Sequence, residues 1–183
     1  MRKTGIILAV TAITATASLA QVKQEQPISA LKGHNSNAPV DVTADRIEVQ
    51  DRADRAIFAG NVHVVQAELT LDTPRLTVAY SGGGQGSNNN VQIRRLDAAG
   101  GVVVKSPTET AKGDFGIYDL DRKLITLIGN VQLNREQNQV NGARLVIDLD
   151  SGRAVVDGGP PGVNQSGGRV SGRFTVPQRQ QQK

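Results

Sequence analysis

Apolar and polar residues alternate in runs of four to eight between Val40 and Asp157. Val62 and Val64, for example, flank the polar residue His63. Such alternation is typical of β-strands with one buried face, because successive side chains point to opposite sides of a sheet. No stretch of this region shows the three-and-four spacing of an amphipathic helix. The pattern predicts an all-β chain with one domain of about 120 residues.

Runs of Gly, Asn, Asp and Ser separate the apolar runs and supply residues that tolerate a positive φ. Strands of this length and spacing predict a sandwich, a jelly roll or an open-ended roll. The apolar parity also switches between Leu71 and Leu76, which predicts a bulge or bend at Asp72, Thr73 and Pro74. The predicted turns are 51–54, Gly60-Asn61, Gly100-Gly101, 119–122, Gly129-Asn130, Asn141-Gly142 and Ser151-Gly152.

An internal repeat relates the two parts of this region. Gly60-Asn61-Val62 recurs 69 residues later as Gly129-Asn130-Val131, and a weaker echo lies at 100–104. Further pairs at the same offset include Asp45 with Asp114, Val49 with Tyr118, Arg75 with Arg144 and Leu76 with Leu145. The repeat predicts two similar β units that each bury an apolar face against the other.

Three segments lie outside the alternation. Residues 21–39 are expected to form a flexible N-terminal segment, and the Gly- and Asn-rich residues 81–90 a flexible loop. Residues 158–183 are rich in Gly, Gln, Ser and Pro and nearly lack apolar side chains, so a disordered tail is expected. Its basic residues are Arg169, Arg173, Arg179 and Lys183.

Residues 1–20 have the layout of a cleavable secretory signal peptide. A basic start at Arg2 and Lys3 precedes a short apolar core, and Ser18 and Ala20 supply the small residues that precede a cleavage site. We therefore expect a mature protein that begins at Gln21 and is located in the periplasm. The chain contains no cysteine, so neither disulfides nor thiolate metal sites are expected to hold the fold.

The charge and the polar residues offer little support for catalysis or nucleic-acid binding. Without Arg2 and Lys3 the chain has 19 basic and 17 acidic residues, and it contains only three Phe and two Tyr. His34 falls in the predicted N-terminal segment, and His63 is expected to be a surface residue. The pairs Asp119/Asp121 and Asp148/Asp150 are expected in turns rather than in a metal site. No enzyme activity, cofactor, metal site or nucleic-acid partner is predicted.

The segments beginning Val40-Asp-Val-Thr-Ala-Asp-Arg-Ile-Glu-Val, Phe58-Ala-Gly-Asn-Val, Leu69-Thr-Leu-Asp-Thr-Pro-Arg-Leu and Leu127-Ile-Gly-Asn-Val resemble the LptA/OstA family. The resemblance covers residues 40–157. It implies a twisted, open-ended β jelly roll that holds the acyl chains of lipopolysaccharide. It also implies end-to-end homo-oligomers that bridge inner-membrane-anchored and outer-membrane subunits with related domains. Two alternatives stay open: a partner-docking roll that carries no lipid, and a secreted β-roll enzyme acting on polysaccharide.

Parity and the resemblance together give a set of inward residues that would contact lipid. Arg75 and Arg144, at equivalent places in the repeat, are candidates to meet lipid phosphates at the rim of the roll. The predicted lipid-binding residues are Val40, Val42, Ile47, Val49, Phe58, Val62, Val64, Leu69, Leu71, Leu76, Val78, Val102, Val104, Tyr118, Leu120, Leu127, Val131, Leu133, Leu145 and Ile147.

Overall fold

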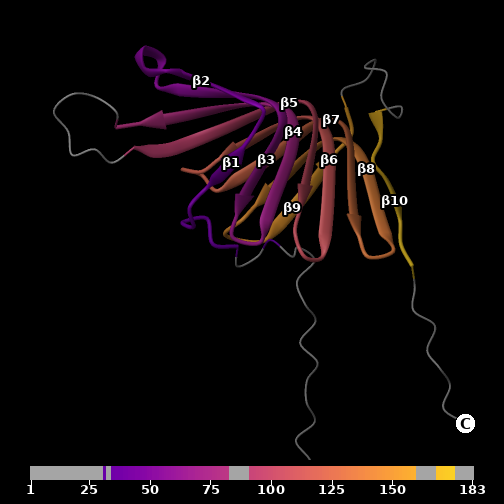
Figure 1. Cartoon of the computed structure of the whole chain (residues 1–183). Helices are drawn as coiled ribbons and strands as arrows, with labels where there is room; N and C mark the ends of the chain where they lie inside the picture. Colours follow the sequence, from indigo (N-terminus) through magenta and orange to yellow (C-terminus); the bar gives the residue numbers. More distant parts are fainter. Residues whose placement is uncertain (1–30, 32–33, 83–90, 160–167, 176–183) are drawn as a thin grey trace, which may run out of the picture.

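A computed structural model describes residue 31 and residues 34–82, 91–159 and 168–175, in which all ten strands belong to one antiparallel sheet. Six long strands follow one another as hairpins (Figure 1). They are β3 (Arg55–Gln66), β4 (Leu69–Ser81), β5 (Gln92–Lys105), β6 (Glu109–Asp119), β7 (Leu124–Arg135) and β8 (Asn138–Asp148). The predicted all-β class is therefore confirmed.

Two short strands pair with each outer long strand. On the N-terminal side, β1 (Asp41–Thr43) and β2 (Arg46–Gln50) both pair with β3, and the 3-10 turn η1 (Asp51–Ala53) follows β2. On the C-terminal side, β9 (Arg153–Asp157) and β10 (Ser171–Arg173) both pair with β8. No strand pair joins these two edges within the described ranges, so the roll stays open.

The long strands have 11 to 14 residues, more than the predicted four to eight. The difference arises because four predicted turns lie inside strands: Gly60-Asn61 in β3, Gly100-Gly101 in β5, Gly129-Asn130 in β7 and Asn141-Gly142 in β8. These four turn predictions were wrong, since a positive-φ dipeptide also suits a bulge in a continuous strand. The predictions at 51–54, 119–122 and 151–152 were right.

β-bulges interrupt the pairing at one level across the sheet. Register shifts separate Ala59 from Val62, Ala99 from Val102 and Ile128 from Val131. The pairing of β4 with β5 also shifts between Asp72 and Arg75, at the predicted bulge or bend, although the extra residue lies in β5. Because a bulge bends its strand, aligned bulges fold the whole sheet across its middle.

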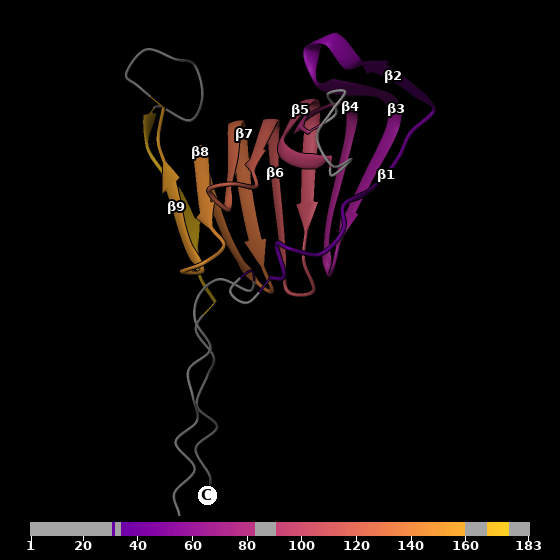
Figure 2. The ribbon, with the colours of Figure 1, turned by 90° about the vertical axis from the view of Figure 1, so that its left-hand side faces the viewer.

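The fold produces two half-sheets that face one another. The β1–β10 half contains β1, β10 and the adjoining halves of the long strands, and the β2–β9 half contains β2, β9 and the other halves. One small cavity is lined by Val64 and Val104 from the β1–β10 half and by Leu96 and Ile125 from the β2–β9 half. The hydrophobic core therefore lies between the halves, inside the curved sheet seen in Figure 2.

Both terminal segments are partly ordered, against the prediction. Leu31 and His34 are buried in the roll, although residues 21–39 were expected to be flexible. Ser171–Arg173 form β10, although residues 158–183 were expected to be disordered. Ser81, the first residue of the predicted 81–90 loop, is the last residue of β4. The predictions for residues 1–20, 83–90, 160–167 and 176–183 lie outside the described residues. Among the residues that are described, no helix is long and apolar enough to cross a membrane.

Candidate functional site

The interior of the roll contains most of the predicted lipid-binding residues. Alternation places them correctly because every second residue of a strand faces the core. Thirteen of the twenty are buried: Val62, Val64, Leu69, Leu71, Leu76, Val78, Val102, Val104, Tyr118, Leu127, Val131, Leu145 and Ile147. Five more are partly buried and pack against this core: Val40, Val42, Phe58, Leu120 and Leu133.

The remaining two, Ile47 and Val49, are 56% and 57% exposed. Their facing is as predicted, since Ile47 pairs with Phe58 and Val49 with Ala56, both of which face the core side. Their burial was not predicted correctly. Both residues are exposed because β2 is an edge strand that extends past the packed core (Figure 1). The repeat thus gave the correct face of Tyr118 from Val49, but it did not reveal that Val49 lies in an edge strand.

Sequence reasoning missed several core residues. Ile125 and Leu96 are buried beside Tyr118 in the paired strands and follow the same alternation. Gln66 is also buried, and its parity with Val62 and Val64 was a usable signal that its polar character obscured. Leu31 offered no periodic signal. The other missed apolar residues are Ala56, Ala98 and Ala111.

The described interior is almost filled by side chains. One apolar cavity of about 20 Å³ lies between the half-sheets, beside Gln66 and Tyr118. A second, of about 10 Å³, lies beside Leu31. Each has room for roughly one water molecule, so neither holds an acyl chain as it stands.

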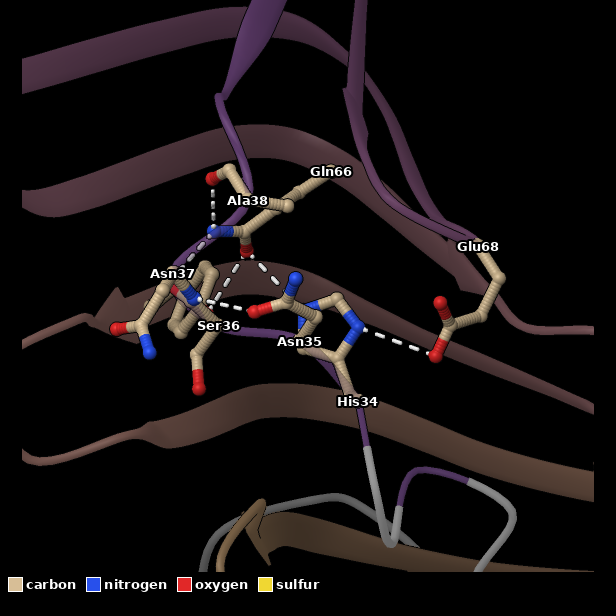
Figure 3. Close-up of polar contacts among 8 residues, drawn as sticks. His34, Asn35, Ser36, Asn37, Ala38, Gln66 and Glu68 are labelled. Carbon is tan, nitrogen blue, oxygen red and sulfur yellow. Dashed lines mark hydrogen bonds and ion pairs between the residues drawn. The ribbon is translucent and has the colours of Figure 1, made fainter.

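A polar cluster lies inside this apolar interior (Figure 3). The Tyr118 hydroxyl donates a hydrogen bond of 2.9 Å to Gln66 Oε1, and His34 Nε2 lies 3.1 Å from the same oxygen. Gln66 Nε2 donates to the backbone carbonyls of Ser36 and Ala38, at 3.0 Å each. Burial raises the pKa of Tyr118 to about 12, although its bond to Gln66 opposes that shift.

The side chain of His34 is fully buried. Its Nδ1 lies 3.4 Å from Glu68 Oε1, close enough for an ion pair if the ring is protonated. That contact lacks hydrogen-bond geometry, and Nδ1 has no other hydrogen-bond partner in the described part of the chain. The prediction that His34 belongs to a flexible segment was therefore wrong.

Charged residues on the outer face form local pairs. His63 Nδ1 and Asp72 Oδ1 are 2.6 Å apart, and Lys105 Nζ donates to Asp72 Oδ2 at 2.9 Å. The hydrogen bond from His63 is the largest cause of the lowered pKa of Asp72, and the hydrogen bond from Lys105 is the second largest. His63 is thus a surface residue, as predicted.

The acidic pairs lie at turns, as predicted: Asp119 and Asp148 end β6 and β8, and Asp121 and Asp150 lie in the turns that follow. Asp148 Oδ1 accepts hydrogen bonds from the backbone amides of Asp150 and Ser151, and Asp119 Oδ1 accepts one from that of Arg122. No group of three or more potential metal ligands occurs among the residues that the structure describes.

Arg75 and Arg144 are exposed and lie in the middle of β4 and β8, on the outer face. Arg144 makes a two-nitrogen contact with Asp157 Oδ2, at 2.6 and 3.0 Å. The predicted position at a rim of the roll was wrong. Both residues follow positions that were predicted as a bulge or bend (72–74) or as a turn (141–142). These positions lie inside continuous strands, so both arginines lie near strand centres.

Residues 41–153 match the model of the LptA/(LptD N-terminal domain) LPS transport protein family. An uncharacterized protein of Rhizobium meliloti (strain 1021) is 34% identical over 147 residues, covering 79% of this chain and 78% of its own length.

Among solved structures, the chain is similar to LptH, described as the LptA homologous periplasmic component of the conserved lipopolysaccharide transport device from Pseudomonas aeruginosa. The TM-score is 0.66 at 18% identity, covering 78% of this chain and 99% of LptH. The expected jelly-roll fold is therefore confirmed. The match over residues 41–153 shows that the chain belongs to the LptA/(LptD N-terminal domain) LPS transport protein family, a family of transport components rather than enzymes.

Proposed function

We propose that this protein is a periplasmic carrier that holds the acyl chains of lipopolysaccharide between its two half-sheets and delivers the lipid towards the outer membrane. The observation that carries the proposal is the inward face of β2. There Ile47 and Val49 continue the apolar lining of the core but remain more than half exposed. An apolar lining that runs from a packed core to an uncovered edge suits a long hydrocarbon ligand.

The hydrophobic effect is large enough for such a role. Each methylene group removed from water contributes about 0.8 kcal/mol, so an acyl chain of about a dozen carbons gains on the order of 10 kcal/mol. The family description and the described role of LptH in a periplasmic transport device both support this substrate and compartment. The proposed leader, residues 1–20, would bring the chain to the periplasm, and the intact mass of the exported protein tests cleavage after Ala20.

The partners proposed are a second copy of this chain and the related domains of inner- and outer-membrane subunits. Each edge of the sheet ends in two short strands, β1 with β2 and β9 with β10. Strands at an edge offer unpaired backbone groups on which another sheet can add. Sedimentation over a wide concentration range should show association that grows with concentration. A monomer at every concentration, with lipid present, would remove the end-to-end bridge from the proposal.

The experiment for lipid carriage is to purify the protein from the periplasm of a lipopolysaccharide-producing bacterium and to quantify bound lipid by mass spectrometry. Val49→Asp places a charge on the inward face without burying it, whereas Glu48→Ala alters the neighbouring outward position. We expect bound lipid with the wild type and with Glu48→Ala, and at least a several-fold loss with Val49→Asp. Equal lipid on both variants would contradict the proposal.

The second candidate is a partner-docking roll that carries no lipid. The nearly filled interior, with cavities of about 20 and 10 Å³, favours it. Wild-type protein that is purified without lipid, yet captures related membrane subunits, would support this candidate instead.

A further inference from the structure

We propose that Leu31 and residues 34–38 form a displaceable plug that occupies the acyl-chain slot, and that lipid binds by expelling it. Gln66 is the latch that holds this plug. The inference rests on the proposed lipid-carrying function and adds a closed, self-occupied state of the carrier.

Leu31 lies where a hydrocarbon ligand would lie. Its side chain is 2% exposed and lines the small cavity together with Val104 and Ala111 of the β1–β10 half and Ile147 of the β2–β9 half. A branched hydrocarbon group from outside the strands thus fills the space between the two faces. An acyl chain entering that space must displace it, since the free volume left is about 10 Å³.

The hydrogen bonds between the plug and the strands converge on one side chain. Gln66 accepts from His34 and donates to the carbonyls of Ser36 and Ala38. The two carbonyl partners require the NH₂ group on their side, which fixes the orientation of the amide. Figure 3 shows this amide beside the plug, with Glu68 on the other side of the His34 ring. The Gln66 oxygen also accepts a hydrogen bond from Tyr118.

The plug can leave without breaking the sheet. Its backbone hydrogen bonds are local: His34 N to Leu31 O, Ser36 N to His34 O and Ala38 N to Asn35 O. No backbone bond joins it to a strand in the described part of the chain, and β1 begins only at Asp41. The buried His34 Nδ1 also lacks a hydrogen-bond partner there, and such an atom lowers the stability of the closed state. These features distinguish the plug from the strands around it.

Hydrogen exchange tests the displacement on the unmodified mature protein. Exchange is measured by mass spectrometry with and without purified lipopolysaccharide, and native mass spectrometry of the same samples gives the lipid occupancy. We expect amides in residues 34–38 to exchange about tenfold faster in the occupied protein, because local unfolding exposes them. Amides in the centre of β7 should not change. Unchanged or slower exchange at 34–38 in lipid-occupied protein would overturn the inference.

Latch variants give an independent test through affinity. Gln66→Leu removes the polar latch and leaves an apolar slot, and Leu31→Ser weakens the plug itself. If the plug is closed in about nine molecules of ten, its release lowers the apparent Kd for lipopolysaccharide about tenfold, because affinity scales with the competent fraction. Gln132→Leu, on the outer face of β7, is the matched control and should leave the Kd unchanged. Circular dichroism verifies that each variant is folded.

The outcomes separate the two proposals. If neither wild type nor variants bind lipid, the proposed function fails and the plug has no ligand to exclude. If wild type binds lipid but both variants bind equally or more weakly while folded, the plug inference alone is wrong. Tighter binding by both variants, with faster exchange at 34–38 on lipid addition, supports the plug.

Discussion

Asn130 donates a hydrogen bond from Nδ2 to Oδ2 of Asp114 at 2.9 Å, and the equivalent pair in the repeat, Asn61 and Asp45, does the same at 2.8 Å. Both asparagines have φ of 44° and follow glycines with φ of 80°. The Asp side chain of a neighbouring segment therefore braces the bulge in β3 and the bulge in β7. The repeat in the sequence is a repeat of this bending device.

The braced bulge predicts a specific sensitivity at Gly129. A methyl group there would collide with the Asp114 carboxylate, whereas one at Gly101 would meet open space at a comparable positive φ. We expect Gly129→Ala to lower the free energy of unfolding by about 2–4 kcal/mol and Gly101→Ala by about 1 kcal/mol, the latter through backbone strain alone. Urea unfolding measures both. Equal losses of unfolding free energy in the two variants would mean that the contact with Asp114 does not affect stability.

The two faces of β5 predict opposite responses to a charge. Val104 is buried between the half-sheets, and its neighbour Val103 lies on the outer face opposite Asp72. We expect Val104→Asp to destabilise the fold by about 3 kcal/mol or more and Val103→Asp by less than about 1 kcal/mol. Thermal unfolding followed by circular dichroism compares them. A similar loss in both variants would contradict the assigned faces.

The Asp72 cluster predicts an acid-dependent contribution to stability. The pKa of Asp72 is lowered from 3.8, so its carboxylate stabilises the folded state above that pH and loses this effect as the pH falls through the lowered value. Because the side chain is partly exposed, Asp72→Asn should cost only about 0.2–1 kcal/mol at pH 7, and less in high salt. The difference from wild type should vanish once the pH lies below the lowered pKa of Asp72. A constant difference from pH 7 to pH 2 would exclude the charge as its cause.

Tyr118 predicts an alkaline effect of the opposite sign. Its pKa is raised from 10.0 to about 12, so the unfolded chain ionises first and stability falls as the pH rises through this window. The Tyr118→Phe variant lacks this alkaline loss of stability. The raised pKa of Tyr80 affects the stability of wild type and variant equally. The stability gap between wild type and variant should therefore narrow, or reverse, between pH 9 and pH 12. Parallel curves over that range would show that Tyr118 does not titrate as predicted.

The all-β class and the inward face were predictable because alternation is a local signal. The alternation is present within each strand that contains Val62, Val64, Leu76 or Leu145. The burial of these residues follows because alternate side chains of a strand point to the same face. Strand length was not predictable in the same way. A Gly-Asn pair fits both a hairpin turn and a bulge. The hydrogen bond from its Asn to Asp45 or Asp114, which are distant in the sequence, favours the bulge.

The polar part of the candidate site could not be predicted from the sequence, for a different reason. His34 and Gln66 are 32 residues apart, and each alone has the character of a surface residue. Their burial depends on mutual hydrogen bonds and on Leu31, whose surroundings have no periodic pattern. Likewise, Ile47 and Val49 show the alternation of a core strand, and only the order of the sheet reveals that β2 lies at its edge.

The central claim, that lipid lies between the half-sheets, is tested most directly by photo-crosslinking at two phenylalanines. Phe58 faces inward and packs against the core, whereas Phe115 faces outward and is 54% exposed. A benzoyl-phenylalanine introduced at either site keeps the aromatic ring, so the comparison isolates the face. Irradiation in living cells should attach lipopolysaccharide to the protein labelled at position 58 and little or none at position 115. Equal attachment at both positions in folded protein, or attachment at position 115 alone, would contradict the account.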